Sequence, residues 1–305
     1  MESLHAAARP FRFLLIILIS SSFSAFAAQN RKDLCGLSIH TADFPGVGNF
    51  SAIEATWTIP GVRPRPDISG MNPPYVFYGV SLCCGENCSS RVSAGMMAAP
   101  WAWNETGYSF TAIPIYQLSP DFPQRQVPQE HNFYFNSSDT LWTRLTIESP
   151  TRAHITFSKF ITDDTNLTVT ADIDIGNDGE QPLANVVTRG NGVEVHDPIS
   201  SRWRNISVAP LCGESAWWFV SDKFDPGEDT ERWDPLPRFS PILIAGHGLE
   251  TTQGKSFPRD LPLSGQARFW TMVRDEAGRT EELCTVKGFV DTGMTMVHAP
   301  NAWGI

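Results

Sequence analysis

The feature that most restricts the fold of this 305-residue chain is an alternation of apolar and polar residues with a period of two. In segment 51–59, Ile53 and Trp57 lie on one side of an extended chain and Glu54 lies on the other. No window of useful length has the i, i+3, i+4 spacing of an amphipathic helix. The other predicted strands are 75–82, 91–97, 108–118, 140–148, 152–161, 166–173, 204–208, 215–220, 240–245, 267–274, 282–290 and 294–297. So many strands without helices predict two packed antiparallel sheets, an all-β sandwich.

The charge of the chain argues against a nucleic-acid partner. It has 33 acidic and 23 basic residues, a formal net charge of −10, and no basic run. A protein that binds nucleic acid needs a basic face that releases counterions from the phosphates. We therefore expect no nucleic-acid partner.

The N-terminus has the pattern of a secretory signal peptide. Arg9 and Arg12 precede an apolar segment centred on 13–19, and Ala25 and Ala27 provide the small residues of a cleavage site. The apolar stretch is shorter than the ~20 residues that a membrane span needs. These observations predict a signal peptide at 1–27 and a single secreted domain at 28–305, with no membrane attachment after cleavage.

Glycosylation sequons and cysteines also favour secretion. The six N-x-S/T sequons are at Asn49, Asn87, Asn104, Asn136, Asn166 and Asn205. The six cysteines are Cys35, Cys83, Cys84, Cys88, Cys212 and Cys284. In an oxidising compartment they favour disulfides over a metal site, because no second Cys/His pair has finger-like spacing.

Three short motifs resemble catalytic or metal sites but lack essential parts. The triplet 291–293 (DTG) has no second copy to form the carboxylate pair of an aspartic peptidase. Segment 172–180 has the acidic spacing of a calcium loop, but Gly176 stands where a ligand is needed. Segment 213–215 (GES) is half of a nucleophile elbow, with Trp217 in place of the closing glycine. We expect no metal and no cofactor.

Four segments, in order and spacing, resemble the secreted glutamic peptidases of the eqolisin family. They are 49–60 (NFSAIEATWTIP), 75–95 (YVFYGVSLCCGENCSSRVSAG), 116–121 (YQLSPD) and 211–224 (LCGESAWWFVSDKF). The resemblance extends over roughly residues 45 to 300. It implies a concanavalin A-like antiparallel β-sandwich of two large sheets, in agreement with the predicted strands.

The resemblance also implies where catalytic residues should lie, and this chain differs there. In the family a Glu activates water as a general base and a Gln helps to hold the oxyanion, both on the concave sheet. Ser93 stands at the Gln position, Trp217 at the Glu position, and Gln117 replaces a supporting Glu. An indole cannot exchange a proton near neutral or acidic pH, and serine is too short to replace the amide.

We therefore expect a catalytically degenerate, monomeric homologue whose concave cleft binds an extended peptide. Aromatic rings suited to line that cleft are Trp101, Trp103, Tyr116 and Trp217. One alternative is a lectin-like module that stacks these rings on sugars of a glycan ligand. Another is an active acid endopeptidase that uses a displaced carboxylate, Glu214 or Glu54, so the sequence leaves enzymatic activity open.

The resemblance also suggests a disulfide pairing. The family links the strand pair before its Gln to the segment before its Glu, which here implies a bond between Cys88 and Cys212. The adjacent Cys83 and Cys84 cannot easily share one partner. Each is expected to pair with one of Cys35 and Cys284.

Overall fold

The fold was analysed in a computed structural model of the chain. It describes residues 28–63, 75–85, 90–104, 107–119, 125–126, 135–137, 139–162, 165–174, 184–190, 193–199, 210–221, 236–260, 262–263, 265–276, 279–290 and 293–298. The regular structure of this part is β-strand, apart from the short 3₁₀ helix η1 (Thr41–Asp43). The predicted signal peptide and the predicted strand 204–208 lie outside the described residues.

Hydrogen bonding orders the first sheet as β18-β2-β14-β5-β6-β7-β8, antiparallel throughout. The short strand β1 joins the edge of β18 in parallel. The bounds are β1 Gln29–Arg31, β2 Leu34–His40, β5 Val76–Cys84, β6 Ser90–Asn104, β7 Gly107–Ser119, β8 Arg125–Gln126, β14 Ser215–Ser221 and β18 Arg268–Glu276.

The second sheet has the order β19-β20-β16-β3-β9-β10-β11-β12-β13, also antiparallel. The bounds are β3 Phe50–Thr58, β9 Thr140–Ser149, β10 Arg152–Thr162, β11 Thr165–Asp174, β12 Ala184–Gly190, β13 Val193–Ile199, β16 Ile242–Thr251, β19 Arg279–Val290 and β20 Gly293–His298. β18 and β19 pair as a hairpin and connect the two sheets. The short strand β17 (Ser256–Phe257) pairs antiparallel with the end of β16. A separate two-stranded sheet is formed by β4 (Val62–Arg63) and β15 (Arg238–Phe239).

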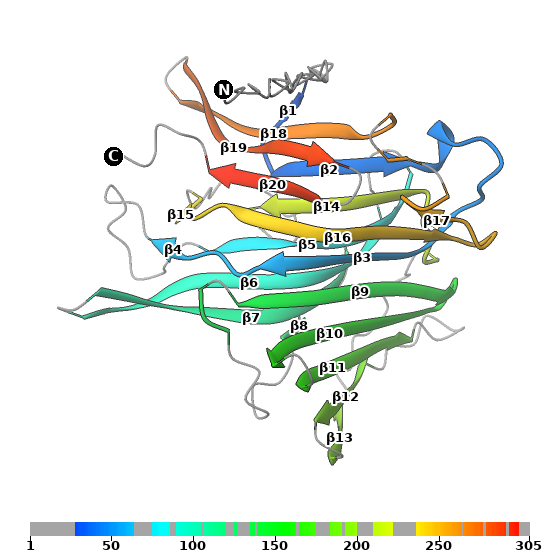
Figure 1. Ribbon diagram of the computed structural model, residues 1–305, viewed down its shortest axis with the longest axis horizontal. Coiled ribbons are helices and arrows are strands. Elements are labelled where there is room, and N and C mark those ends of the chain that lie inside the picture. The colour runs from blue at the N-terminus through cyan, green and yellow to red at the C-terminus, as the bar shows by residue number, and fades with distance from the viewer. Residues whose placement is uncertain are drawn as a thin grey trace, which may run out of the picture.

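The two sheets pack face to face around one large core. In Figure 1 their strands overlap and cross the molecule in nearly the same direction. The ring centroids of Trp57 in β3 and Tyr78 in β5 are 5.8 Å apart, and the Trp218 indole N–H in β14 donates to the Glu54 carbonyl at 3.1 Å. Burial raises the pKa of the Tyr78 phenol well above its usual value, so that group stays neutral. The prediction of an all-β antiparallel sandwich is confirmed.

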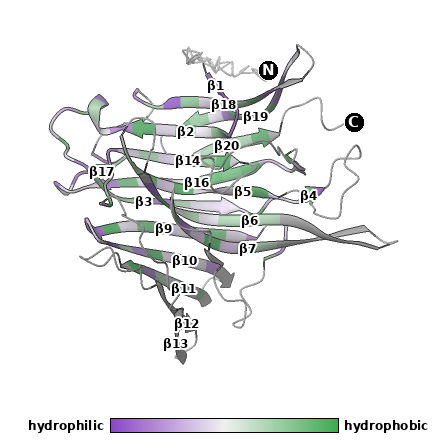
Figure 2. Ribbon diagram, turned by 180° about the vertical axis from the view of Figure 1, so that it is seen from behind, coloured by the Kyte–Doolittle hydropathy of each residue, from purple (hydrophilic) through white to green (hydrophobic). Residues whose placement is uncertain are grey.

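Alternation of side chains accounts for the two faces of each sheet. In β9 the buried and partly buried residues alternate, as the ribbon of β9 in Figure 2 changes between green and purple along its length. In β3, Ile53 and Trp57 enter the core as predicted, together with Ala55, and Glu54 lies on the other side. Core-facing and outward-facing positions can therefore be assigned residue by residue.

Strand β2 was missed by the sequence analysis, although all seven of its residues are buried. Its third residue, Gly36, disfavours a strand on propensity alone. Here a Cβ at this position would lie 2.1 Å from the Trp218 carbonyl oxygen of β14. Only glycine permits this close approach of two backbones.

A second close approach, between β5 and β6, leads to a stability prediction. A Cβ on Gly95 would lie 2.1 Å from the Tyr78 carbonyl oxygen and 2.6 Å from the Gly79 Cα. Because backbone atoms cannot move aside cheaply, we expect Gly95→Ala to lower the free energy of unfolding by about 1–3 kcal/mol. Urea denaturation measures this, with Gly265→Ala as the control. Nothing lies within 4 Å of a Cβ on Gly265, so the control should change stability by about 0.5 kcal/mol or less. Equal effects of the two substitutions would contradict the close packing of β5 on β6.

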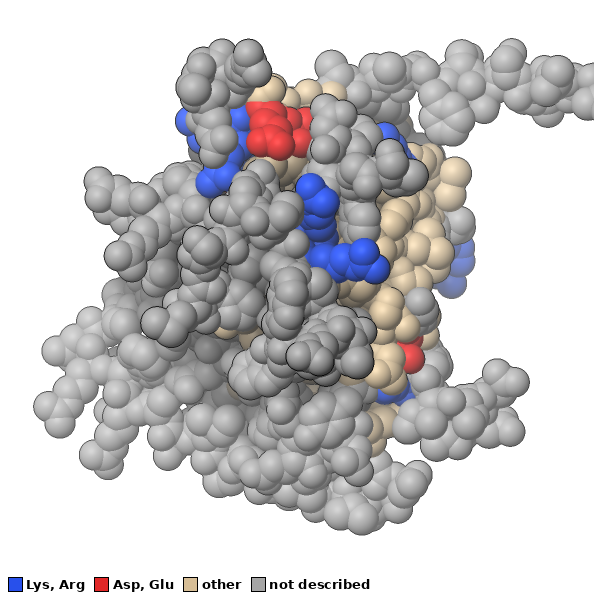
Figure 3. All heavy atoms as spheres, turned by 90° about the vertical axis from the view of Figure 1, so that its left-hand side faces the viewer, with Lys and Arg blue, Asp and Glu red and all other residues tan. Residues whose placement is uncertain are grey.

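One end of the sandwich shows only a few charged side chains of the described residues. In Figure 3 these are several basic groups and a smaller number of acidic ones, and an acidic group lies beside a basic one near the top of the view. Among the described residues, no helix has the length and hydrophobicity to cross a membrane. In the same part of the chain, no group of three or more His, Cys, Asp or Glu side chains is arranged to hold a metal ion.

Candidate functional site

The outer face of the first sheet, the face turned away from the second sheet, brings the sequence-predicted catalytic positions together. The register pairs Trp217 of β14 with Ser38 on one side and Ser81 on the other. Ser81 pairs in turn with Ser93, and Ser93 with Gln117. These five residues form one row across the sheet, which we call the cross-strand row. Ser93, Trp217 and Gln117, predicted separately from the sequence, therefore lie in one line.

Hydrogen bonds fix the orientation of several side chains in and beside this row. The hydroxyl oxygens of Ser81 and Ser93 are 2.5 Å apart, and both residues are buried. The Trp217 indole N–H donates to the Ser215 hydroxyl at 3.1 Å. The Ser38 hydroxyl lies 3.2 Å from Nε2 of His40. The row therefore offers hydroxyl, amide and indole groups, with the His40 imidazole beside it, but no carboxylate.

The absence of carboxylates extends to every described position of the five strands that carry the row. Neither Asp nor Glu occurs anywhere in the sequences of β2, β5, β6, β7 and β14. A carboxylate that acts as general base would thus have to come from outside these strands. Ser38, Ser81 and His40 were not singled out from the sequence, although their polar character at alternate positions of apolar strands was a usable signal.

Glu54, one of the two fallback carboxylates, cannot serve this face. It lies on β3 of the second sheet, on the side turned away from the core, and its carboxylate accepts from Arg144 at 2.9 Å. Arg144 also pairs with Glu250 at 2.7 Å. The prediction that Glu54 reaches the same cleft is therefore wrong, because Glu54 is on the wrong sheet.

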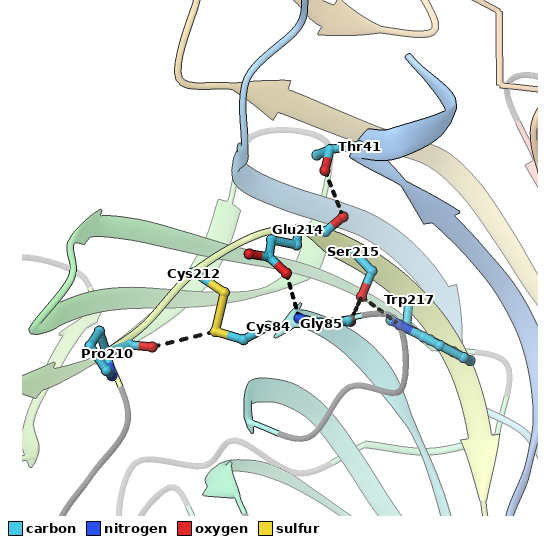
Figure 4. The surroundings of a disulfide bond; sticks show 8 residues. All are labelled: Thr41, Cys84, Gly85, Pro210, Cys212, Glu214, Ser215 and Trp217. Carbon is cyan, nitrogen blue, oxygen red and sulfur yellow. Dashed lines mark hydrogen bonds between the residues drawn. A yellow bond between two sulfur atoms is a disulfide. The ribbon is translucent and has the colours of Figure 1, made fainter. Parts of the chain in front are cut away.

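Glu214, the other fallback carboxylate, lies at the end of the first sheet, directly before β14 (Figure 4). Its carboxylate accepts from the Gly85 N–H at 2.7 Å, and its backbone carbonyl accepts from the Thr41 hydroxyl at 3.1 Å. In Figure 4 the carboxylate and the Trp217 indole lie on opposite sides of Ser215. Glu214 is therefore near the cross-strand row but points away from it.

A pocket of about 530 Å³ adjoins Glu214. It lies between the connection from β2 to β3 and the chain before β14. The lining residues are His40, Thr41, Ala42, Phe44, Pro45, Gly46, Gly48, Asn49, Gly85 and Glu214. Glu214 is the acidic residue among those that line this pocket.

The aromatic residues predicted to line a cleft do not share one location. Trp217 is on the outer face but only 2% exposed, in a buried apolar cluster with Leu34, Phe77, Cys83, Ile113, Ile115 and Phe219. Tyr116 enters the core between the sheets, because β7 turns Ile115 and Gln117 outward, so its predicted place in the cleft is wrong. Trp101 and Trp103 lie on β6, and their side chains are outside the described part.

The disulfides differ from the predicted pairing. Cys212 bonds to Cys84, not to Cys88, and Figure 4 shows this bond beside Glu214. Cys35 and Cys284 bond to each other rather than to Cys83 and Cys84. Cys83 is also disulfide-bonded, and its side chain faces the outer apolar cluster. Adjacent cysteines on a strand point to opposite faces, so they bond to partners in different places.

Two of the predicted glycosylation sites can be located with their side chains. Asn49 and Asn136 are both exposed, as a glycosylated asparagine must be. Asn104 and Asn166 lie on β6 and β11, and their side chains are outside the described part. Asn87 and Asn205 are not among the described residues. Glycosylation stays a prediction at all six positions.

Comparison with known proteins gives similarity in structure but not in sequence. No protein-family model matches the chain, and no curated protein matches it. A crystal structure of Scytalido-glutamic peptidase with a peptide-based transition state analog has a TM-score of 0.54 and 14% identity, covering 88% of this chain and 99% of that one. The structure of SCP-B, a member of the Eqolisin family of peptidases, in complex with the tripeptide Ala-Ile-His has a TM-score of 0.51 with the same identity and coverage. The chain therefore has the fold of the glutamic peptidases.

Proposed function

We propose that this protein is a secreted, catalytically inactive relative of the glutamic peptidases, and that the outer face of its first sheet binds an extended peptide. The observation that carries the proposal is the composition of the cross-strand row. An indole stands where the family resemblance calls for a catalytic glutamate, and no acidic residue occurs in the five strands around it.

The chemistry of peptide hydrolysis explains why this composition points to inactivity. Water attacks an amide only when a general base removes its proton, and losing such a group lowers the rate by about 10²-fold or more. The oxyanion needs donors at fixed positions, and losing one costs a further factor of about 10² to 10³. Ser93 donates or accepts toward Ser81 rather than standing alone on the face. The row thus lacks a carboxylate base, and a serine hydroxyl stands at the position where the resemblance expects the glutamine amide.

Several features favour a peptide as the ligand. The fold neighbours hold peptide-like molecules, a peptide-based transition state analog in one and Ala-Ile-His in the other. The outer apolar cluster and the row place apolar, hydroxyl and amide side chains together on one face of the first sheet. Apolar surface with a few placed polar groups is typical of ligand sites. A glycan ligand is the alternative, tested by a glycan array beside the peptide assay.

Secretion is part of the same proposal. Disulfides persist in oxidising compartments, and the described part of this chain shows two bonds between residues far apart in sequence, with separations of 249 and 128 residues. Together with the N-terminal pattern and the sequons, they support an extracellular location. We further propose that the secreted protein is a monomer.

Glu214 provides the test of catalytic activity, because it is the carboxylate that faces the 530 Å³ pocket. Secreted protein and the Glu214→Gln variant are incubated with a denatured protein substrate across acidic pH. We expect both to cleave at background level, as measured by release of amino groups. Cleavage by the unmodified protein that is lost in Glu214→Gln would show an active endopeptidase with a displaced base, and would overturn the proposal of inactivity.

A further inference from the structure

Two tryptophans on the outer face of the first sheet form a stacked pair. The ring centroids of Trp217 in β14 and Trp270 in β18 are 5.4 Å apart, with an angle of 25° between their planes. β2 runs between these two strands, and its residue opposite Trp270 is Gly36. Because Gly36 has no side chain, the rings can meet across β2.

Hydrogen bonds hold both rings in place. The Trp217 N–H donates to the Ser215 hydroxyl at 3.1 Å, and the Trp270 N–H donates to the Ser38 hydroxyl at 2.8 Å. An indole has one donor, so each ring is satisfied at its polar edge. The faces of the rings are left for contacts other than hydrogen bonds.

The guanidinium of Arg31 lies against both rings. Its Cζ atom is 5.3 Å from the ring centroid of Trp217 and 5.4 Å from that of Trp270, within the range of a cation–π contact. Nε and one Nη of Arg31 each donate to an oxygen of Asp33 at 2.7 Å. The planar group is thus held by two aromatic rings and one carboxylate, the combination that suits a guanidinium better than an ammonium.

Arg31 reaches this place from β1, the short strand that pairs in parallel with the edge of β18. In this pairing Arg31 is opposite Met272 and Gln29 is opposite Trp270. A three-residue edge strand is a weak attachment compared with the long antiparallel pairs of the same sheet. Such an edge is the place where an extended peptide can add by backbone hydrogen bonds.

We propose that Trp217, Trp270 and Asp33 form a guanidinium-binding site, occupied in this structure by the chain's own Arg31, which an arginine of an extended peptide replaces. This inference rests on the proposed peptide-binding function and names the side chain that the site selects. The intramolecular Arg31 competes with the peptide, so its removal should raise the apparent affinity by about tenfold or more.

The test uses the full secreted protein and the Arg31→Gln variant, titrated by calorimetry with an acetylated and amidated Gln-Asn-Arg tripeptide that copies β1. The control peptide carries citrulline, which has the shape of arginine without its charge. We expect Arg31→Gln to bind the arginine peptide at least tenfold more tightly than the unmodified protein, and to bind the citrulline peptide at least tenfold more weakly than the arginine peptide. Adding Trp270→Leu should remove the preference for arginine.

Equal binding of the two peptides by a folded Arg31→Gln variant, or binding of neither, would overturn the guanidinium site. If Arg31→Gln is not secreted, Arg31→Lys, which keeps the aliphatic part of the side chain, is titrated with the same two peptides. Equal binding of the two peptides by this variant, or binding of neither, would likewise overturn the guanidinium site. If the protein binds a mixed peptide library, and this binding requires neither arginine in the peptide nor Trp270, the peptide-binding function is supported but the guanidinium site is not.

Discussion

Replacing both Cys35 and Cys284 with alanine is expected to lower the free energy of unfolding by about 2–5 kcal/mol. This disulfide joins residues 249 positions apart, and its Cα atoms are 5.7 Å apart. Through the strands that carry the two cysteines it ties β2 of the first sheet to β19 of the second. A bond that closes so long a loop removes much conformational freedom from the unfolded chain. Both sulfurs are in the core, so alanine is a better replacement than the polar serine.

The two single variants provide the control. Either substitution breaks the same bond, so Cys35→Ala, Cys284→Ala and the double variant should lose similar amounts of stability in urea denaturation. Losses that simply add would mean that the cysteines contribute by packing alone, and would contradict a cross-link in the secreted protein. All measurements are made without reductant, because the reduced protein is a different reference state.

The sequence predicted the architecture well because one face of most strands is buried against the other sheet. β9 and β3 alternate cleanly, and both were found. β2 was missed because Gly36 disfavours a strand. The reason for that glycine is the Trp218 carbonyl of β14, which belongs to a residue 182 positions away in sequence. Local propensity contains no information about such a distant approach.

Only part of the candidate site was predicted from the sequence. The resemblance placed Ser93, Trp217 and Gln117 in one region, and the register puts them in one row. Alternation could not tell that Tyr116 faces inward, because β7 is apolar on both faces and either assignment fits the pattern. Glu54 was assigned to the cleft because the sequence does not say to which sheet a strand belongs.

The disulfide pairing was also beyond what the sequence could predict. Cys83 and Cys84 are adjacent, so they leave β5 on opposite faces, and which of them meets Cys212 depends on that direction. Arg31, Asp33 and Trp270 carried no recognisable signal either. The parallel pairing of β1 with β18 brings them together, and three residues are too few to predict such a pairing.

Trp218→Ala is expected to have an effect on stability as large as loss of the disulfide, about 3–5 kcal/mol. Trp218 is fully buried, and its ring meets His247 of the second sheet edge-on at a centroid distance of 5.5 Å. Its N–H donates to the Glu54 carbonyl, so truncation leaves both a cavity and an acceptor without its partner. Trp142→Ala is the matched control, because Trp142 is only partly buried on β9 and should cost about 1 kcal/mol. Urea denaturation of both variants measures the difference. Similar losses for the two would mean that Trp218 does not join the sheets, and would require a different packing of β14 on β3.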